Sequence, residues 1–269
     1  MSEKEQLSSP QTTGMTEAEK KAQALLEEKE AEMRVRVFDT KANAILSILL
    51  VIWSIFQLYA NTIGTMSAMT LRAWHIMFLL VFTFCLYPTF KKERKMRKAP
   101  PIWDFVLAGL SIVVYGYMIK NYTAIALRGG YLETIDYIVA GIGIVLVFEA
   151  ARRACGSLAV LALVFLAYNF LGPLIPGELG HTGFPLSRVL SHMFWGSQGI
   201  FGVGIGVSAT YIFLFVVFGA FLKYSGFSQF INDLALTLVG RSPGGPAKVA
   251  VIASALLGMS NGSAIANVA

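Results

Sequence analysis

The sequence is short of charged residues: only 14% of its 269 positions are Asp, Glu, Lys or Arg, while 55% are hydrophobic. Soluble domains carry roughly 25% charged residues. Of the 38 charged residues, 16 precede Ala42, and the 228 residues that follow hold only 22. A water-soluble fold could not cover its surface with so little polar material, so the composition predicts an integral membrane protein.

Cysteine and histidine are also scarce. Cys85 and Cys155 have no metal-binding spacing and lie in or beside apolar runs, which indicates buried thiols rather than a disulfide or a metal site. The three histidines, His75, His181 and His192, are scattered and accompany no nucleophile or acid–base motif. We interpret His181 and His192 as solvated or interfacial, and we expect neither enzymatic activity nor a bound cofactor.

The net charge of +6 does not indicate a nucleic-acid partner, because the basic residues are unevenly placed. Six of them lie between two apolar runs, in residues 91–98. Basic loops of this kind remain on the cytoplasmic side of a membrane. Together with Arg34, Arg36 and Lys41 before the first run and Arg152 and Arg153 after the fourth, they predict a cytoplasmic N-terminus.

The first 41 residues are polar and acidic, with no apolar segment near Met1, so we expect no signal peptide. Thr16 and Glu19 form a capping-box pattern ahead of a charged helix through Lys41. We interpret residues 1–41 as a cytoplasmic tail followed by a solvated helix that leads into the membrane.

Six apolar segments of spanning length follow, at residues 42–59, 71–90, 102–119, 135–151, 158–175 and 202–222. The ionisable residues inside them, such as His75, Asp104, Asp136 and Glu149, lie within about two turns of an end. We expect these side chains to reach the lipid headgroups. The predicted fold class is therefore an all-α integral membrane protein, a polytopic helix bundle.

Two amphipathic helices are expected to lie on the membrane surfaces. One begins behind Pro185, inside the outer loop 172–201, with Leu186, Val189, Leu190, Met193 and Phe194 on its apolar face. The other spans residues 227–239, which are too few to cross a bilayer, and is predicted to brace the bundle on the inner side.

The last segment predicts a re-entrant helical hairpin. Pro246 restarts a helix, residues 249–259 are largely apolar, and small and polar residues then interrupt the pattern from Gly258 to Ala264. Broken backbone at membrane depth needs polar partners, and unwound carbonyls with Ser and Asn oxygens suit Na⁺. A second interpretation stays open, in which the small residues only allow tight helix packing.

Residues 233–236, 240–241, 244–251 and 258–268 closely resemble a known family, and residues 211–221 are similar to it as well. It is the large membrane subunit of tripartite ATP-independent periplasmic (TRAP) transporters, particularly the fused permeases that work with TAXI-type binding proteins. The first four spans resemble, by order and number, the small membrane subunit fused ahead of it.

This resemblance implies a Na⁺-driven permease of the bacterial inner membrane that imports an organic-acid anion delivered by a periplasmic binding protein. It implies a small-subunit-like scaffold at residues 42–154 and the start of a transport domain at residues 155–269, ending inside the first hairpin. It also implies that the hairpin contributes to a sodium site, at Ser260, Asn261, Gly262, Ser263 and Asn267.

Because the family's second hairpin does not follow Ala269, we expect the chain to be a fragment or a truncated product. An alternative function is a membrane scaffold or assembly subunit without a transport site of its own, or a non-functional fragment. A membrane enzyme is a third class of function, but the sequence lacks the catalytic motifs that such an enzyme would need.

Overall fold

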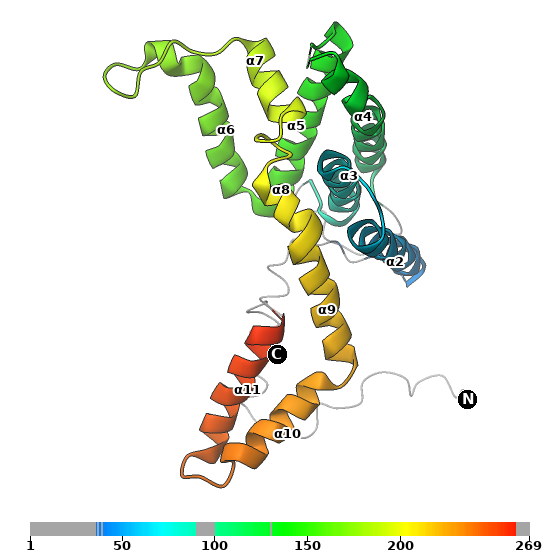
Figure 1. Cartoon of the computed structure of the whole chain (residues 1–269), viewed down its shortest axis with the longest axis vertical. Helices are drawn as coiled ribbons and strands as arrows, with labels where there is room; N and C mark the ends of the chain where they lie inside the picture. Colours follow the sequence, from blue (N-terminus) through cyan, green and yellow to red (C-terminus); the bar gives the residue numbers. More distant parts are fainter. Residues whose placement is uncertain (1–35, 37, 39, 90–99, 130, 262–269) are drawn as a thin grey trace, which may run out of the picture.

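The computed structural model describes residues 36, 38, 40–89, 100–129 and 131–261. The predicted N-terminal helix, the basic loop at residues 91–98 and the last eight residues lie outside this part of the chain. None of the elements that the described residues form is a β-strand (Figure 1). The all-helical prediction is therefore confirmed.

All six predicted spans are present as apolar helices of membrane-crossing length. They cover Lys41–Thr62, Ala68–Leu86, Ile102–Leu127, Thr134–Cys155, Ser157–Leu174 and Val203–Leu222. The first four fall in α2 (Thr40–Thr62), α3 (Ala68–Leu86), α4 (Ile102–Leu127) and α5 (Thr134–Cys155); the fifth combines α6 (Ser157–Leu171) with the short 3₁₀ helix η2 (Gly172–Leu174). The fold is thus a polytopic helical membrane protein.

The sixth span is not a uniform α-helix. It consists of α8 (Val203–Val207), a π-helical turn η4 (Ser208–Ile212) and α9 (Phe213–Tyr224). Figure 1 shows α9 leading away from the bundle towards α10 (Phe227–Val239) and α11 (Gly245–Asn261). Gly226 and Gly244, with φ of 82° and 75°, form the turns before these two helices in a conformation that favours glycine.

Helix α10 has the bounds that its amphipathic pattern predicted. Its apolar face packs on α11, where Ile231 and Ala235 of α10 and Ala253 of α11 form a small buried cluster. Other members of the predicted face, such as Phe230 and Leu238, are more than half exposed. The two helices therefore form a helical hairpin with a hydrophobic core of its own, and they run in opposite directions (Figure 1).

The main core lies between α3, α4, α5 and the segment after α7 (Leu186–Leu190). Three fully buried rings meet at its centre: that of Phe194 lies 5.6 Å from that of Tyr115 and 5.7 Å from that of Phe201. Such tilted and edge-on pairs are favourable geometries for aromatic side chains. Helix α7 and the π-helical turn η3 (Ser191–Trp195) therefore insert into the bundle beside α5.

This insertion corrects the prediction of a surface helix behind Pro185. The helix begins where the sequence predicted, at Leu186, but Phe194 and Trp195 are buried among α4 and α5 rather than laid on a membrane surface. Leu186, assigned to the apolar face, is 61% exposed. Packing between the helices buries more of the apolar surface of these aromatic side chains than a position on the membrane surface would.

The prediction that ionisable residues reach headgroups is also wrong at several positions. Asp104 and Asp136 are fully buried, and His75 is 2% exposed. Each side chain instead bonds to a residue of a neighbouring helix. Of the two thiols, Cys85 is half-buried, while Cys155 is exposed, which corrects the expectation of a buried thiol there.

Candidate functional site

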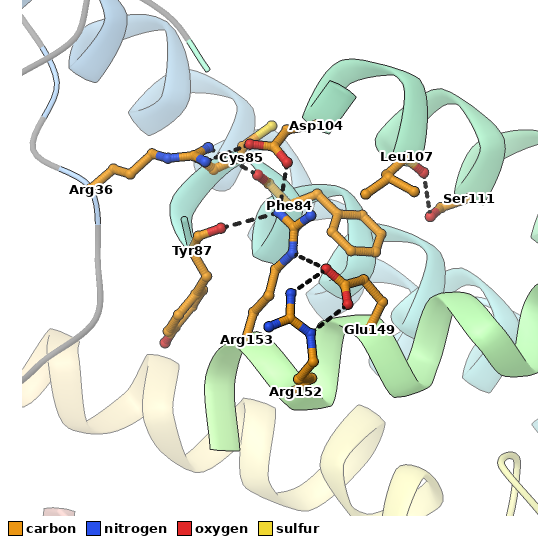
Figure 2. A network of polar contacts seen from close by, with 10 residues as sticks. All are labelled: Arg36, Phe84, Cys85, Tyr87, Asp104, Leu107, Ser111, Glu149, Arg152 and Arg153. Atoms are coloured by element: carbon orange, nitrogen blue, oxygen red, sulfur yellow. Dashed lines mark hydrogen bonds and ion pairs between the residues drawn. The ribbon is translucent and has the colours of Figure 1, made fainter. Parts of the chain in front are cut away.

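The strongest polar site in the described residues is a buried network at the end of the bundle where α3 ends and α4 begins (Figure 2). Asp104, in the first turn of α4, accepts from Arg36 Nη2 at 2.5 Å and from Arg153 Nη1 at 2.6 Å. Both guanidinium groups are at most 2% exposed and the carboxylate is fully buried. Asp104 thus joins the segment before α2 to the end of α5.

The same network extends through backbone carbonyls and a second carboxylate. Arg36 donates to the carbonyls of Phe84 and Cys85, and Arg153 donates to that of Tyr87. On α5, Glu149 accepts from both Arg152 and Arg153, as Figure 2 shows. Because buried charges are stable only when paired and hydrogen-bonded, this network fixes the relative positions of α3, α4 and α5.

A second buried carboxylate lies at the opposite end of α5. Asp136 accepts from the Tyr117 hydroxyl at 2.8 Å and from the backbone N–H of Glu133 at 2.9 Å, the latter as part of a capping box. The Trp195 indole donates to the backbone carbonyl of Asp136 at 3.2 Å. These contacts cap α5 and hold η3 against it.

The π-helical turn in the sixth span meets α2 and α3 through polar side chains. The N–H of Phe213 donates to the carbonyls of Ser208 and Thr210, and not to that of Ala209, which would be its acceptor in an α-helix. The Ala209 carbonyl accepts instead from Gln57 Nε2 at 2.6 Å and Asn61 Nδ2 at 3.0 Å. A π-helical turn changes the hydrogen-bond pattern of a helix and can leave a carbonyl available to other donors. Here the Ala209 carbonyl links the sixth span to α2.

Of the predicted sodium-site residues, Ser260 and Asn261 lie in the described part of α11. Helix α11 continues through Asn261, three residues past the predicted start of the interruption at Gly258, and at Ser260 and Asn261 only the backbone is described. Gly262, Ser263 and Asn267 lie outside the described residues. The sodium site therefore stays a prediction. Within the described residues, no three His, Cys, Asp or Glu side chains are grouped to hold a metal ion.

Two kinds of polar residue were missed by reasoning from the sequence. The sequence analysis used Arg36 and Arg153 as evidence for the membrane orientation and expected Asp104 to reach the headgroups. Charged residues beside apolar runs also form buried ion pairs. Gln57 and Asn61 were overlooked because they are uncharged; their spacing of four residues puts both on one face of α2. His181, expected to be solvated or interfacial, is half-buried and bonds to the backbone at Tyr168 and Gly183.

These helices, their apolar surfaces and the polar joints between them define the class: a multi-pass helical membrane protein. Residues 142–269 match the model of a family described as the tripartite ATP-independent periplasmic transporter, DctM component. The match begins inside α5, ahead of the domain boundary predicted after residue 154. No curated protein matches the chain significantly, and no solved structure does either.

Proposed function

We propose that the chain is a membrane permease component of a TRAP-type secondary transporter that imports an organic-acid anion. The observation that carries this proposal is the family match over residues 142–269, which covers α6, the sixth span and the α10–α11 hairpin. The proposed location is the bacterial inner membrane, with the N-terminus in the cytoplasm. Basic residues gather before the first span, in the loop at residues 91–98 and after the fourth span, and this distribution supports the orientation.

The proposed partner is a periplasmic binding protein of the TAXI type that delivers the substrate. We assign residues 42–154 to a scaffold like the small membrane subunit and residues 155–269 to the beginning of the transport domain. The continuous core of α3, α4 and α5, into which Phe194, Trp195 and Phe201 of the following region also pack, supports a rigid scaffold. The separate cluster between α10 and α11 supports a hairpin that packs independently of it.

Na⁺ is the proposed coupling ion, with Ser260, Asn261, Gly262, Ser263 and Asn267 as its site. Serine hydroxyls, the asparagine side-chain oxygen and backbone carbonyls are hard oxygen ligands of the kind that transporters use for Na⁺ at interrupted helices. Ser260 and Asn261 lie in α11 directly after its apolar residues, as the proposed hairpin requires, which supports this assignment.

The test is uptake of a radiolabelled organic acid into proteoliposomes that contain the full-length permease and its binding protein. An inward Na⁺ gradient should drive uptake, whereas an equal K⁺ gradient should not. Ser260→Ala, Asn261→Ala and Ser263→Ala should each raise the Na⁺ concentration for half-maximal uptake by about tenfold, equivalent to about 1.4 kcal/mol. Ser225→Ala, an exposed serine between α9 and α10, is the control and should match the wild type.

A second candidate function is a scaffold or assembly subunit without its own transport site. The buried Arg36–Asp104–Arg153 network, which ties three helices together, favours this role for the N-terminal half. In that case the chain would copurify with another permease subunit, and uptake would be insensitive to all three alanine substitutions.

A further inference from the structure

A cavity of about 660 Å³ lies between α4, α6, α7 and η3, at the end of the bundle opposite the Asp104 network. Its volume is in the range of small-molecule sites. Ile125, Val189 and Met193 supply apolar walls, and Tyr122 and Trp195 supply aromatic ones. The cavity is therefore mainly apolar and lies near the ends of two membrane-length helices, α4 and α6.

Several hydrogen-bond donors line this cavity without a partner in the described part of the chain. The Arg188 guanidinium stacks over the Phe184 ring, 5.4 Å from its centroid, and no described carboxylate lies within ion-pair distance of it. The Ser191, His192 and Tyr122 side chains also line the cavity and make no hydrogen bond to another described residue. One permanent cation and three further donors thus line a space with no acidic side chain among its described lining residues; Arg188 and His192 are exposed, and Ser191 and Tyr122 are half-buried.

This combination selects among possible occupants. An apolar molecule would leave the guanidinium without a counter-charge, while a small free anion would leave the apolar walls against water. A phospholipid satisfies both, because its phosphate accepts hydrogen bonds from arginine and hydroxyl groups while its acyl chains cover apolar surface. Aromatic side chains at the level of the headgroups are also typical of membrane proteins.

We propose that this cavity is a binding site for a single phospholipid, whose phosphate bonds to Arg188 with the help of Ser191, His192 and Tyr122. The glycerol and upper acyl chains lie against Ile125, Val189 and Met193. The site is independent of the proposed transport function, since it involves neither the α10–α11 hairpin nor the predicted sodium ligands. The bound lipid would fill the space between α4 and the inserted α7–η3 segment.

Native mass spectrometry of the purified full chain tests the proposal, with phosphatidylglycerol, diacylglycerol of the same acyl chains, and inorganic phosphate as three probes. We expect retained phosphatidylglycerol, little retained diacylglycerol, and no displacement of the lipid by millimolar phosphate. Equal retention of the two lipids would reduce the site to an apolar groove, and displacement by phosphate would make it a site for a free anion. Either result overturns the proposal.

Variants separate the charge from the shape of the cavity. Arg188→Gln should weaken phosphatidylglycerol retention by about tenfold or more, and Arg188→Lys should retain it within about threefold, because the positive charge remains. Arg241→Gln removes the same charge from an exposed turn outside the cavity and should have no effect.

Ala126→Phe keeps every donor but fills the cavity from an exposed position on α4, and it should also weaken retention. It provides a second test if Arg188→Gln fails to fold. Retention at the wild-type level in a folded Arg188→Gln or Ala126→Phe variant would refute the site.

Discussion

Arg153 and Asp104 are 49 residues apart in the sequence, yet the Arg153 Nη1 atom lies 2.6 Å from the Asp104 Oδ1 atom, with both side chains at most 2% exposed. The second carboxylate oxygen of Asp104 accepts from Arg36. A single aspartate therefore pairs with two guanidinium groups that belong to different parts of the chain (Figure 2). Removing it would leave both groups buried without their shared counter-charge.

Asp104→Asn should destabilise the protein by about 3–5 kcal/mol, because it removes the carboxylate charge that both buried guanidinium groups share and leaves Glu149 as the carboxylate paired with Arg153. The measurement is reversible unfolding of the purified chain in mixed detergent micelles. Asp233→Asn is the matched control, since Asp233 is exposed on α10 and the described residues give its carboxylate no ion-pair partner. Equal unfolding curves for the two variants would show that the network does not stabilise the fold.

Gln57 and Asn61 share one acceptor, the Ala209 carbonyl, and their substitutions should be non-additive. Gln57→Leu alone should cost about 0.6–1 kcal/mol, since Asn61 still satisfies the carbonyl. Gln57→Leu with Asn61→Leu should cost more than the sum of the single changes, because a buried carbonyl then has no side-chain donor.

A double-mutant cycle in detergent micelles measures this coupling. Asn121→Leu is the control: its amide bonds to a carbonyl of its own helix, that of Tyr117, and its loss should be nearly neutral. Strict additivity at Gln57 and Asn61 would contradict the role assigned to the freed carbonyl.

Gly143→Ala should loosen the inserted η3 segment. A methyl group at Gly143 of α5 would collide with the buried ring of Phe194, and an overpacked core typically loses about 1–3 kcal/mol. Gly141 lies two residues earlier on the same helix and has open space around it. Gly141→Ala should therefore be neutral or stabilising by up to about 1 kcal/mol.

Thermal unfolding of the two glycine variants compares them directly. Adding Phe194→Leu should recover part of the stability that Gly143→Ala removes, because the smaller side chain relieves the collision. A Gly143→Ala protein as stable as Gly141→Ala would show that Phe194 does not occupy this position.

Ala253→Leu should separate α11 from α10 without altering a proposed sodium ligand. Ala253 is 4% exposed and packs against Ile231 and Ala235, so a larger side chain cannot fit without displacing a helix. We expect the Na⁺-driven uptake proposed above to fall several-fold. Ala250→Leu, at an exposed position of α11, should transport normally, and equal activity of the two variants would show that this packing does not position the hairpin.

Much of the fold could be predicted from local properties of the chain. Five of the six spans begin within a residue of their expected starts, and α10 has its expected bounds, because hydropathy over 13 to 20 residues decides whether a helix can form and cross. The candidate sites were less predictable. Arg36 and Gln57 act through partners 68 and 152 residues away, and no local pattern encodes such a distance.

The sequence by itself determined that this protein is a helical membrane protein with six spanning-length segments, because water cannot solvate so much apolar surface and lipid cannot solvate a backbone that lacks internal hydrogen bonds. Only the tertiary structure decided that Asp104 pairs with arginines from two distant segments and that Phe194 enters the core. The reason is physical: a buried charge or ring is stable only where neighbouring helices bring the matching group or space, and those neighbours come from remote parts of the chain.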